Sequence, residues 1–83
     1  MNYDMTIERH RVIKAGIENG WSRSASPNFD LWSRGDREVQ VFYSNEGSTV
    51  NSAASIDHGT RTTKAVRPPE DLVAQVLQWL SAP

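Results

Sequence analysis

The chain has 83 residues, of which 37% are hydrophobic and 23% charged, and nine Lys and Arg against ten Asp and Glu leave a net charge of −1. This balance is typical of a soluble globular domain and argues against a strongly basic nucleic-acid binder. The absence of cysteine excludes disulfides and thiolate zinc sites, and we expect neither a metal ion nor another cofactor. No apolar run reaches the roughly 18 residues of a membrane span and no signal sequence is visible. We therefore expect a single cytoplasmic domain over residues 1–83.

The first segment predicts a helix over residues 4–19. Asp4 or Thr6 is a suitable N-cap, and Asn19-Gly20 is a suitable stop. Gly16 costs about 1 kcal/mol relative to alanine inside a helix, which indicates that a strand or a second helix approaches closely there. The stripe that faces the core recurs at spacings of three and four and is formed by Ile7, His10, Ile13 and Ile17.

The middle of the chain predicts three antiparallel strands after a polar connection at residues 22–27. Alternation between turn signals places the strands over residues 28–33, 37–44 and 49–57. A two-residue turn at Gly35-Asp36 pairs Trp32 with Val39 and puts Trp32 inside. A three-residue loop would pair Leu31 with Val39 instead, and we favour the first register.

The second hairpin is predicted to turn at Glu46-Gly47. This turn pairs Tyr43 with Val50 and Val39 with Ala54, so that the apolar faces of the two strands coincide. Val50, Ala54 and Ile56 are then expected on the inner face.

Residues 58–67 are polar and predict a loop with a short extended piece at Ala65-Val66. The last helix is predicted over residues 69–81, because proline suits the first turn and the acidic Glu70 and Asp71 complement the helix dipole. Its broad apolar face is formed by Leu72, Val73, Val76, Leu77, Trp79 and Leu80. The predicted fold class is α+β in the order α-β-β-β-α, a three-stranded antiparallel meander with two helices on one face.

Two helices cover one face of such a sheet, so the other face meets water or a partner. In the favoured register an apolar patch with a polar rim lies on that open face, and a partner docks on it or one of the loops 22–27 and 58–67 folds over it. We favour a partner protein, with a homodimer through this face or a free strand edge as a further form. The expected contact residues are Phe29, Leu31 and Phe42, with Arg37, Glu38 and Gln40 at the rim.

No constellation of residues indicates catalysis, and we expect no enzyme activity. His58 follows Asp57, but adjacent side chains on a strand point to opposite faces and do not form a triad. His10, His58 and Asp57 have no metal-ligand spacing on one element. Arg34-Gly35-Asp36 matches an adhesion tripeptide, and we interpret it as a hairpin turn.

Basic residues supply an alternative, a nucleic-acid site built from Arg61, Lys64 and Arg67 with the first helix. The order α-β-β-β-α resembles the double-stranded RNA-binding domain. That family carries lysines at the start of its last helix, whereas this chain has the acidic turn Pro68-Pro69-Glu70-Asp71. Nucleic acid therefore ranks below a protein partner, and we expect no membrane partner.

Several short motifs together resemble small uncharacterised accessory proteins of mycobacteriophages and related actinobacterial phages. These motifs are Asn19-Gly20-Trp21, Trp32-Ser33-Arg34-Gly35-Asp36, Val39-Gln40-Val41 and Val76-Leu77-Gln78-Trp79-Leu80. The resemblance implies a non-enzymatic accessory phage protein that binds a host protein in the host cytoplasm. It carries over no catalytic residue.

Overall fold

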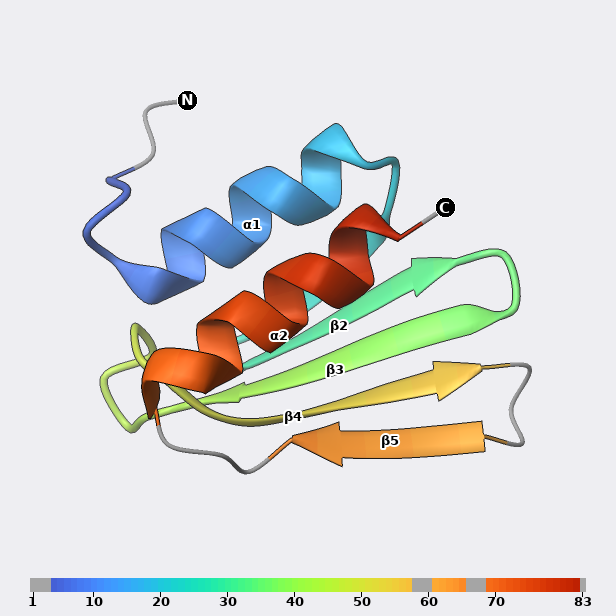
Figure 1. Ribbon diagram of the computed structural model, residues 1–83. Coiled ribbons are helices and arrows are strands. Elements are labelled where there is room, and N and C mark those ends of the chain that lie inside the picture. The colour runs from blue at the N-terminus through green and yellow to red at the C-terminus, as the bar shows by residue number, and fades with distance from the viewer. Residues whose placement is uncertain (1–3, 58–60, 66–68, 83) are drawn as a thin grey trace.

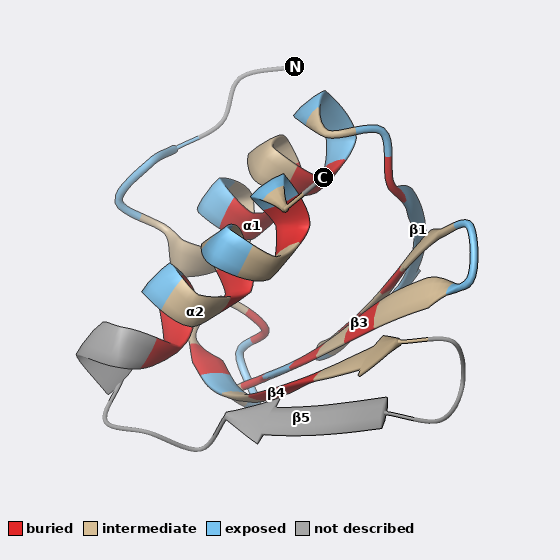
Figure 2. Ribbon diagram, turned by 45° about the vertical axis from the view of Figure 1, so that its right-hand side comes forward, coloured by how far each residue is buried: buried red, intermediate tan, exposed pale blue. Residues whose placement is uncertain are grey.

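The computed structural model describes residues 4–57, 61–65 and 69–82. The elements in chain order are α1 (Glu8–Glu18), β1 (Ser22–Ser26), β2 (Phe29–Arg34), β3 (Arg37–Tyr43), β4 (Val50–Asp57), β5 (Arg61–Ala65) and α2 (Pro69–Ser81). The strands form one antiparallel sheet in the order β1-β2-β3-β4-β5, and both helices lie on the same face of it (Figures 1 and 2). The α+β class is confirmed, whereas the prediction of three strands is wrong because the sheet has two further strands, one at each edge.

The two unpredicted strands lie in segments that lack alternation. β1 lies in the expected connection at residues 22–27, and its five residues Ser-Arg-Ser-Ala-Ser are all exposed. It pairs with β2 from Ser22↔Ser33 to Ser26↔Phe29. β5 lies in the expected loop at residues 58–67 and pairs with β4. A strand at a sheet edge has one neighbour, so pairing can hold it without the alternating pattern that burial of one face imposes.

The helix α1 begins four residues later than predicted. The carboxylate of Asp4 does not cap the helix, because its Oδ1 accepts hydrogen bonds from the backbone N–H (2.9 Å) and hydroxyl (2.6 Å) of Thr6 and closes a turn before the helix. The first turn of α1 is instead held by β4, since Oε1 of Glu8 accepts the backbone N–H of Val50 at 2.8 Å.

The first hairpin has the favoured register. Trp32 pairs with Val39, and Arg34 pairs with Arg37 across the two-residue turn at Gly35-Asp36. The side chain of Trp32 is fully buried. The prediction that this turn directs Trp32 inward is therefore confirmed.

The second hairpin departs from its predicted register. Tyr43 pairs with Val50 as predicted, but the pairing shifts between Phe42 and Tyr43, so that Val39 opposes Ser55 and not Ala54. The shift leaves Asn51 without a partner residue, which is a β-bulge. The bulge puts Ala53 on the inner face with Val50 and leaves Ala54 and Ile56 on the outer face, which corrects the expected inner set.

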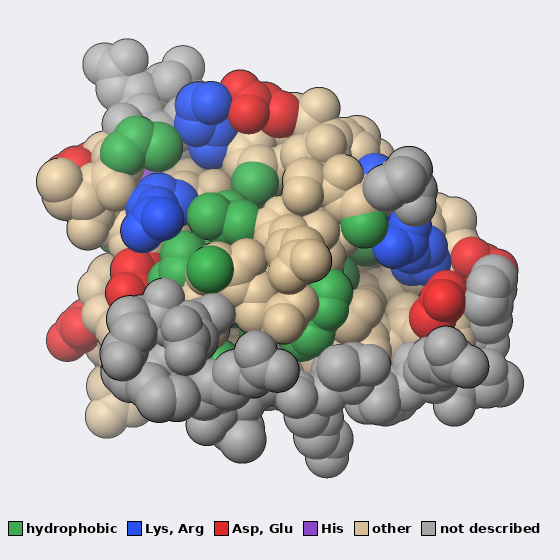
Figure 3. All heavy atoms as spheres, viewed as in Figure 1, with side chains coloured by type: hydrophobic (Ala, Val, Ile, Leu, Met, Phe, Trp, Pro, Cys, Tyr) green, Lys and Arg blue, Asp and Glu red, His purple; other side chains and the backbone are tan. Residues whose placement is uncertain are grey.

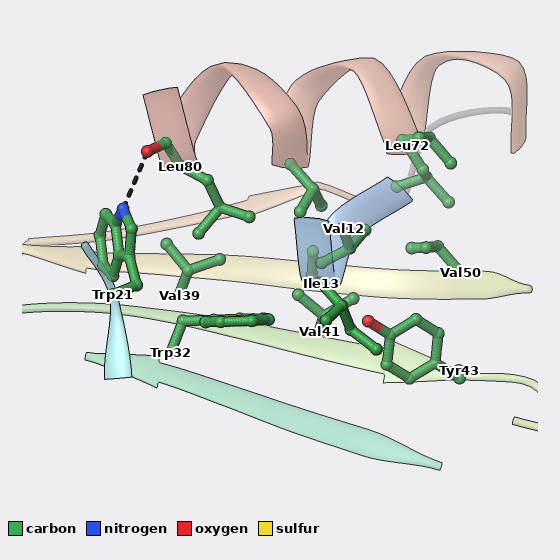
Figure 4. Packing of buried hydrophobic residues seen from close by; sticks show 13 residues of the cluster. Val12, Ile13, Trp21, Trp32, Val39, Val41, Tyr43, Val50, Leu72 and Leu80 are labelled. Carbon is green, nitrogen blue, oxygen red and sulfur yellow. Dashed lines mark hydrogen bonds between the residues drawn. The ribbon is translucent and has the colours of Figure 1, made fainter. Parts of the chain in front are cut away.

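The core fills the space between the helices and the inner face of the sheet (Figure 4). The indole N–H of Trp21 donates to the carbonyl of Leu80 at 2.8 Å and fastens the end of α2 to the start of β1. A Cβ at Gly16 would lie 2.4–2.6 Å from three ring atoms of Trp32, so the close approach that Gly16 indicated is to β2. The buried cluster is formed by Val12, Ile13, Trp21, Trp32, Val39, Val41, Tyr43, Val50, Ala53, Leu72, Val73, Val76 and Leu80.

Candidate interaction surface

The outer face of the sheet carries a row of apolar side chains. Strand alternation puts Phe29 and Leu31 of β2, Phe42 of β3, and Ala54 and Ile56 of β4 on this side. We call these five residues the outer patch; Phe42 is exposed, Phe29, Leu31 and Ile56 are half-buried, and Ala54 is buried between its neighbours. No element among the described residues lies over this face, because both helices occupy the opposite one (Figures 1 and 2).

The centre of the outer patch is an aromatic pair. Phe29 and Phe42 oppose each other on β2 and β3, and their ring centroids lie 4.8 Å apart with the ring planes tilted by 39°. A tilted, offset arrangement is favourable for two aromatic rings. Phe29 is half-buried and Phe42 is still 42% exposed, so the ring of Phe42 presents apolar surface to solvent or to a partner.

The predicted contact residues divide between the two faces of the sheet. Glu38 and Gln40 alternate with the inward Val39 and Val41, so they lie on the outer face with the patch. Arg37 does not, because its guanidinium carbon lies 6.0 Å from the ring centroid of Trp21 on the helix side. Arg37 is therefore not part of the rim. Among the described side chains, Glu38 is the charged residue on the outer face.

The alternative basic set is spread over the molecule. Arg61 and Lys64 lie in β5 at one edge of the sheet, and Arg67 lies outside the described residues. In α1, which packs against α2 and β1, Arg11 and Lys14 line the space between the helices. The structure therefore does not bring β5 and α1 together as one surface.

A buried carboxylate forms the main polar cluster of the inner face. Asp30 is fully buried. Its Oδ1 accepts from Nη2 of Arg9 (2.8 Å) and Nε of Arg23 (3.0 Å), and its Oδ2 accepts from Nε of Arg9 (3.3 Å) and the hydroxyl of Tyr43 (2.8 Å). Burial, and then the nearby Asp30 carboxylate, raise the pKa of Tyr43 above its ordinary value. Two cations and a neutral hydroxyl thus compensate the buried charge.

The guanidinium of Arg9 also donates to four backbone carbonyls. These are the carbonyls of Ser26 at 2.7 Å, Pro27 at 2.6 Å, Gly47 at 3.1 Å and Phe29 at 3.5 Å. With its donors already engaged, Arg9 fastens α1 to the β1–β2 and β3–β4 turns. The cluster is therefore a structural joint. The signal in the sequence that could have predicted it is strand alternation, which puts Asp30 on the same inner face of β2 as Trp32.

The tripeptide Arg34-Gly35-Asp36 is engaged in the fold. Arg34 donates to the carbonyls of Asn19 (2.9 Å) and Ala82, and its guanidinium carbon lies 4.6 Å from the ring centroid of Trp21. A cation that bonds carbonyls at the C-terminal ends of two helices is favourably placed for their dipoles. The structure thus gives Arg34 a role within the fold, beside the hairpin turn of Gly35.

A shallow groove of about 510 Å³ lies between the two helices. Its walls include the apolar side chains of Met5, Ala15 and Leu77 and the charged side chains of Arg11 and Lys14. Figure 3 views this helix face, where hydrophobic side chains lie exposed among the basic ones. Lys14 is paired with Glu18 at 2.7 Å.

Nothing in the described part of the chain gathers three potential metal-ligating side chains. Nδ1 of His10 accepts the backbone N–H of Asp4 at 2.9 Å, and His58 lies outside the described residues. None of the helices in the described ranges is long and apolar enough to cross a membrane.

Comparisons with models of protein families, with curated proteins and with solved structures find no match to this chain.

Proposed function

We propose that this chain is a non-enzymatic binding module whose outer sheet face docks on a partner protein. The single observation that carries the proposal is the Phe29–Phe42 pair, whose Phe42 ring stays exposed beside the half-buried Phe29 on a face that no described element covers. Exposed aromatic anchors with a polar surround are where the binding energy of protein interfaces concentrates.

The chemistry of the face specifies the kind of partner. The outer patch is apolar, so it fits an apolar protein surface better than an extended charged ligand. Glu38, which has no ion-pair partner among the described side chains, favours a lysine or arginine of the partner opposite it. The partner is therefore a protein with an apolar contact surface and a basic residue at its margin.

Exposed aromatic side chains on a sheet can also stack nucleic-acid bases. Such sites combine stacking with cations that contact phosphates. Of the cations on this sheet, Arg23, Arg34 and Arg37 turn toward the helix side. In the register Lys64 of β5 stands opposite Ala54 of the outer patch, so of these four cations at most this one, at the edge of the sheet, is placed to contact phosphates from the outer face, where Glu38 adds a carboxylate. A protein partner is therefore favoured over a single-stranded nucleic acid at this face.

The test compares two substitutions that introduce the same charge at equally exposed apolar positions. Phe42 is 42% exposed on the outer face, and Met5 is 44% exposed beside the helices. Tagged wild type, Phe42→Asp and Met5→Asp are used to capture partners from an actinobacterial lysate, the source that the phage resemblance suggests, with and without nuclease. Circular dichroism and thermal melts check that both variants fold.

We expect a protein that is retained by wild type and by Met5→Asp after nuclease treatment and is lost with folded Phe42→Asp. Photo-crosslinking then places the contact, with benzoylphenylalanine at Gln40 on the outer face and at Gln78 on α2 as the matched control. Equal capture by the two Asp variants, or crosslinks from Gln78 alone, would exclude the outer face. Loss of capture on nuclease treatment would favour the nucleic-acid alternative.

A further inference from the structure

The edge of β1 is open, and it differs from the other edge of the sheet. β1 ends the strand order and all five of its residues are exposed. β5 at the other edge has two cationic residues in Arg-Thr-Thr-Lys-Ala, and charges of this kind protect sheet edges against pairing. In Ser-Arg-Ser-Ala-Ser the charge of Arg23 is instead paired with Asp30 of the same chain, at 3.0 Å, a carboxylate that it shares with Arg9.

The hydrogen-bond pattern identifies which backbone groups of β1 face the open edge. The carbonyl of Asn28, directly before β2, accepts the backbone N–H of Tyr43 at 2.8 Å. Because backbone groups point alternately to the two sides of a strand, even-numbered residues of β2 bond to β3 and odd-numbered ones bond to β1. The odd-numbered residues of β2 oppose the even-numbered residues of β1. The N–H and C=O groups of Arg23 and Ala25 therefore point to the open edge.

We propose that two copies of this chain pair through β1 in an antiparallel dimer whose two-fold axis passes beside Ser24. In this register Arg23 of each copy opposes Ala25 of the other, and the outward backbone groups of these two residues bond across the interface. The strand is self-complementary in the way that a two-fold interface requires. The two Arg23 side chains do not oppose each other, and each keeps its own Asp30.

An exposed isoleucine of α1 extends this interface above the sheet. Ala15 lines the groove toward α2, Gly16 rests on Trp32, and Ile17 lies about 100° further around the helix. Ile17 is therefore on the flank of α1 that faces away from α2, where it is 53% exposed. Because α1 packs against β1, the second copy joins the sheet on this flank and covers Ile17.

The dimer does not depend on the proposed function, because it uses the edge of the sheet and not its outer face. A two-fold axis through a continuous sheet is perpendicular to the sheet, so the outer patches of both copies lie on the same side. A five-residue strand pair and one apolar side chain form an interface below the standard size of about 1,600 Å². The dimer is consequently weak and reversible.

Proline at Ala25 tests the pairing directly. Proline lacks the N–H that Ala25 presents to the open edge, and edge strands tolerate proline where the N–H faces solvent. Ala25→Ser keeps the N–H and is the matched control. In sedimentation equilibrium between roughly 10 µM and 1 mM, a range suited to a small interface, wild type and Ala25→Ser pass from monomer to dimer and Ala25→Pro stays a monomer. A wild-type monomer over the whole range, or a dimer of Ala25→Pro, would overturn the proposal.

Amide hydrogen exchange of the wild type supplies a measurement that does not depend on whether the proline variant folds. Raising the protein concentration slows exchange at Arg23 and Ala25, whereas Ser24 is already bonded to β2 and changes little. Phe42→Asp dimerises like the wild type, which separates this edge from the outer face. Dimerisation that leaves the Arg23 and Ala25 amides unchanged, or that Phe42→Asp abolishes, would contradict pairing through β1.

Discussion

Replacing Gly16 with alanine adds one methyl group at the point where α1 rests on the indole of Trp32. The new Cβ would lie 2.4 Å from Cζ3 and 2.6 Å from both Cε3 and Cη2, whereas non-bonded carbon atoms normally lie about 3.5–4.0 Å apart. One of the two elements must therefore move by about 1 Å. Trp32 is fully buried, and its rigid ring has no flexible end that could move aside.

The magnitude follows from two opposing effects. Alanine is favoured over glycine inside a helix by about 1 kcal/mol. Overpacking of a buried site costs typically about 1–3 kcal/mol, and contacts to three atoms of a rigid ring place Gly16→Ala at the upper end. The net loss is about 2 kcal/mol, which lowers the melting temperature of a domain of this size by about 8–16 °C.

Thermal and urea unfolding measure this loss, and a double-mutant cycle assigns it to the contact. In a Trp32→Phe background the smaller ring relieves the clash, so Gly16→Ala costs at least about 1 kcal/mol less than in the wild type, within the usual range for coupled neighbours. A Gly16→Ala variant as stable as the wild type, or more stable, would refute the close approach of α1 to Trp32. Equal losses in both backgrounds would show that the cost does not come from the ring.

The buried ion cluster gives two further predictions. Asp30→Asn removes the buried charge that Arg9 and Arg23 share and lowers the free energy of unfolding by about 3–5 kcal/mol. Glu18→Gln breaks the exposed pair with Lys14 and costs about 0.5 kcal/mol or less, so equal losses in denaturant unfolding would contradict the buried role of Asp30. The raised pKa of Tyr43 means that stability is present in full below the unfolded pKa of about 10 and falls as the pH rises above it, by at most about 1.4 kcal/mol per pH unit. Unfolding titrations should show this loss in a Tyr3→Phe background, where Tyr43 is the remaining tyrosine, and not in Tyr43→Phe; tyrosinate absorbance near pH 10 with an intact fold would contradict it.

Periodicity accounts for what could be predicted of the fold. The helix at residues 69–81 and the pairing of Trp32 with Val39 follow from apolar spacing and from the turn at Gly35-Asp36, because burial of one face imposes a pattern on the residues. Edge strands do not require such a pattern, so the sequences of β1 and β5 resemble polar connections. The sequence also does not predict the bulge at Asn51, because one inserted residue exchanges the inward and outward positions that follow it without changing the composition of the strand.

For the candidate site, the alternation of side chains along each strand predicts which face a residue occupies. Phe29, Leu31 and Phe42 lie on the outer face as their positions indicated. Arg37 does not belong to the predicted rim, because its position along β3 is two residues before the inward Val39 and alternation puts both on the same face. The same alternation along β2 places Asp30 inside with Trp32. A buried carboxylate requires cations to compensate its charge.

The compensation of Asp30 connects the interior to the open edge of β1. An inward-pointing charge on an edge strand normally discourages pairing, because a second strand would cover it without a counter-charge. Here Asp30 supplies that counter-charge to Arg23 from within the same chain, so a second copy can cover β1 without leaving an unpaired cation. Sequence spacing did not reveal this arrangement, because Arg9, Arg23 and Asp30 come from three different elements and meet only when the sheet and α1 have packed. The same cluster that fastens α1 to the sheet thereby removes the protection of the β1 edge, which is why we assign the dimer contact to this edge and not to the charged edge at β5.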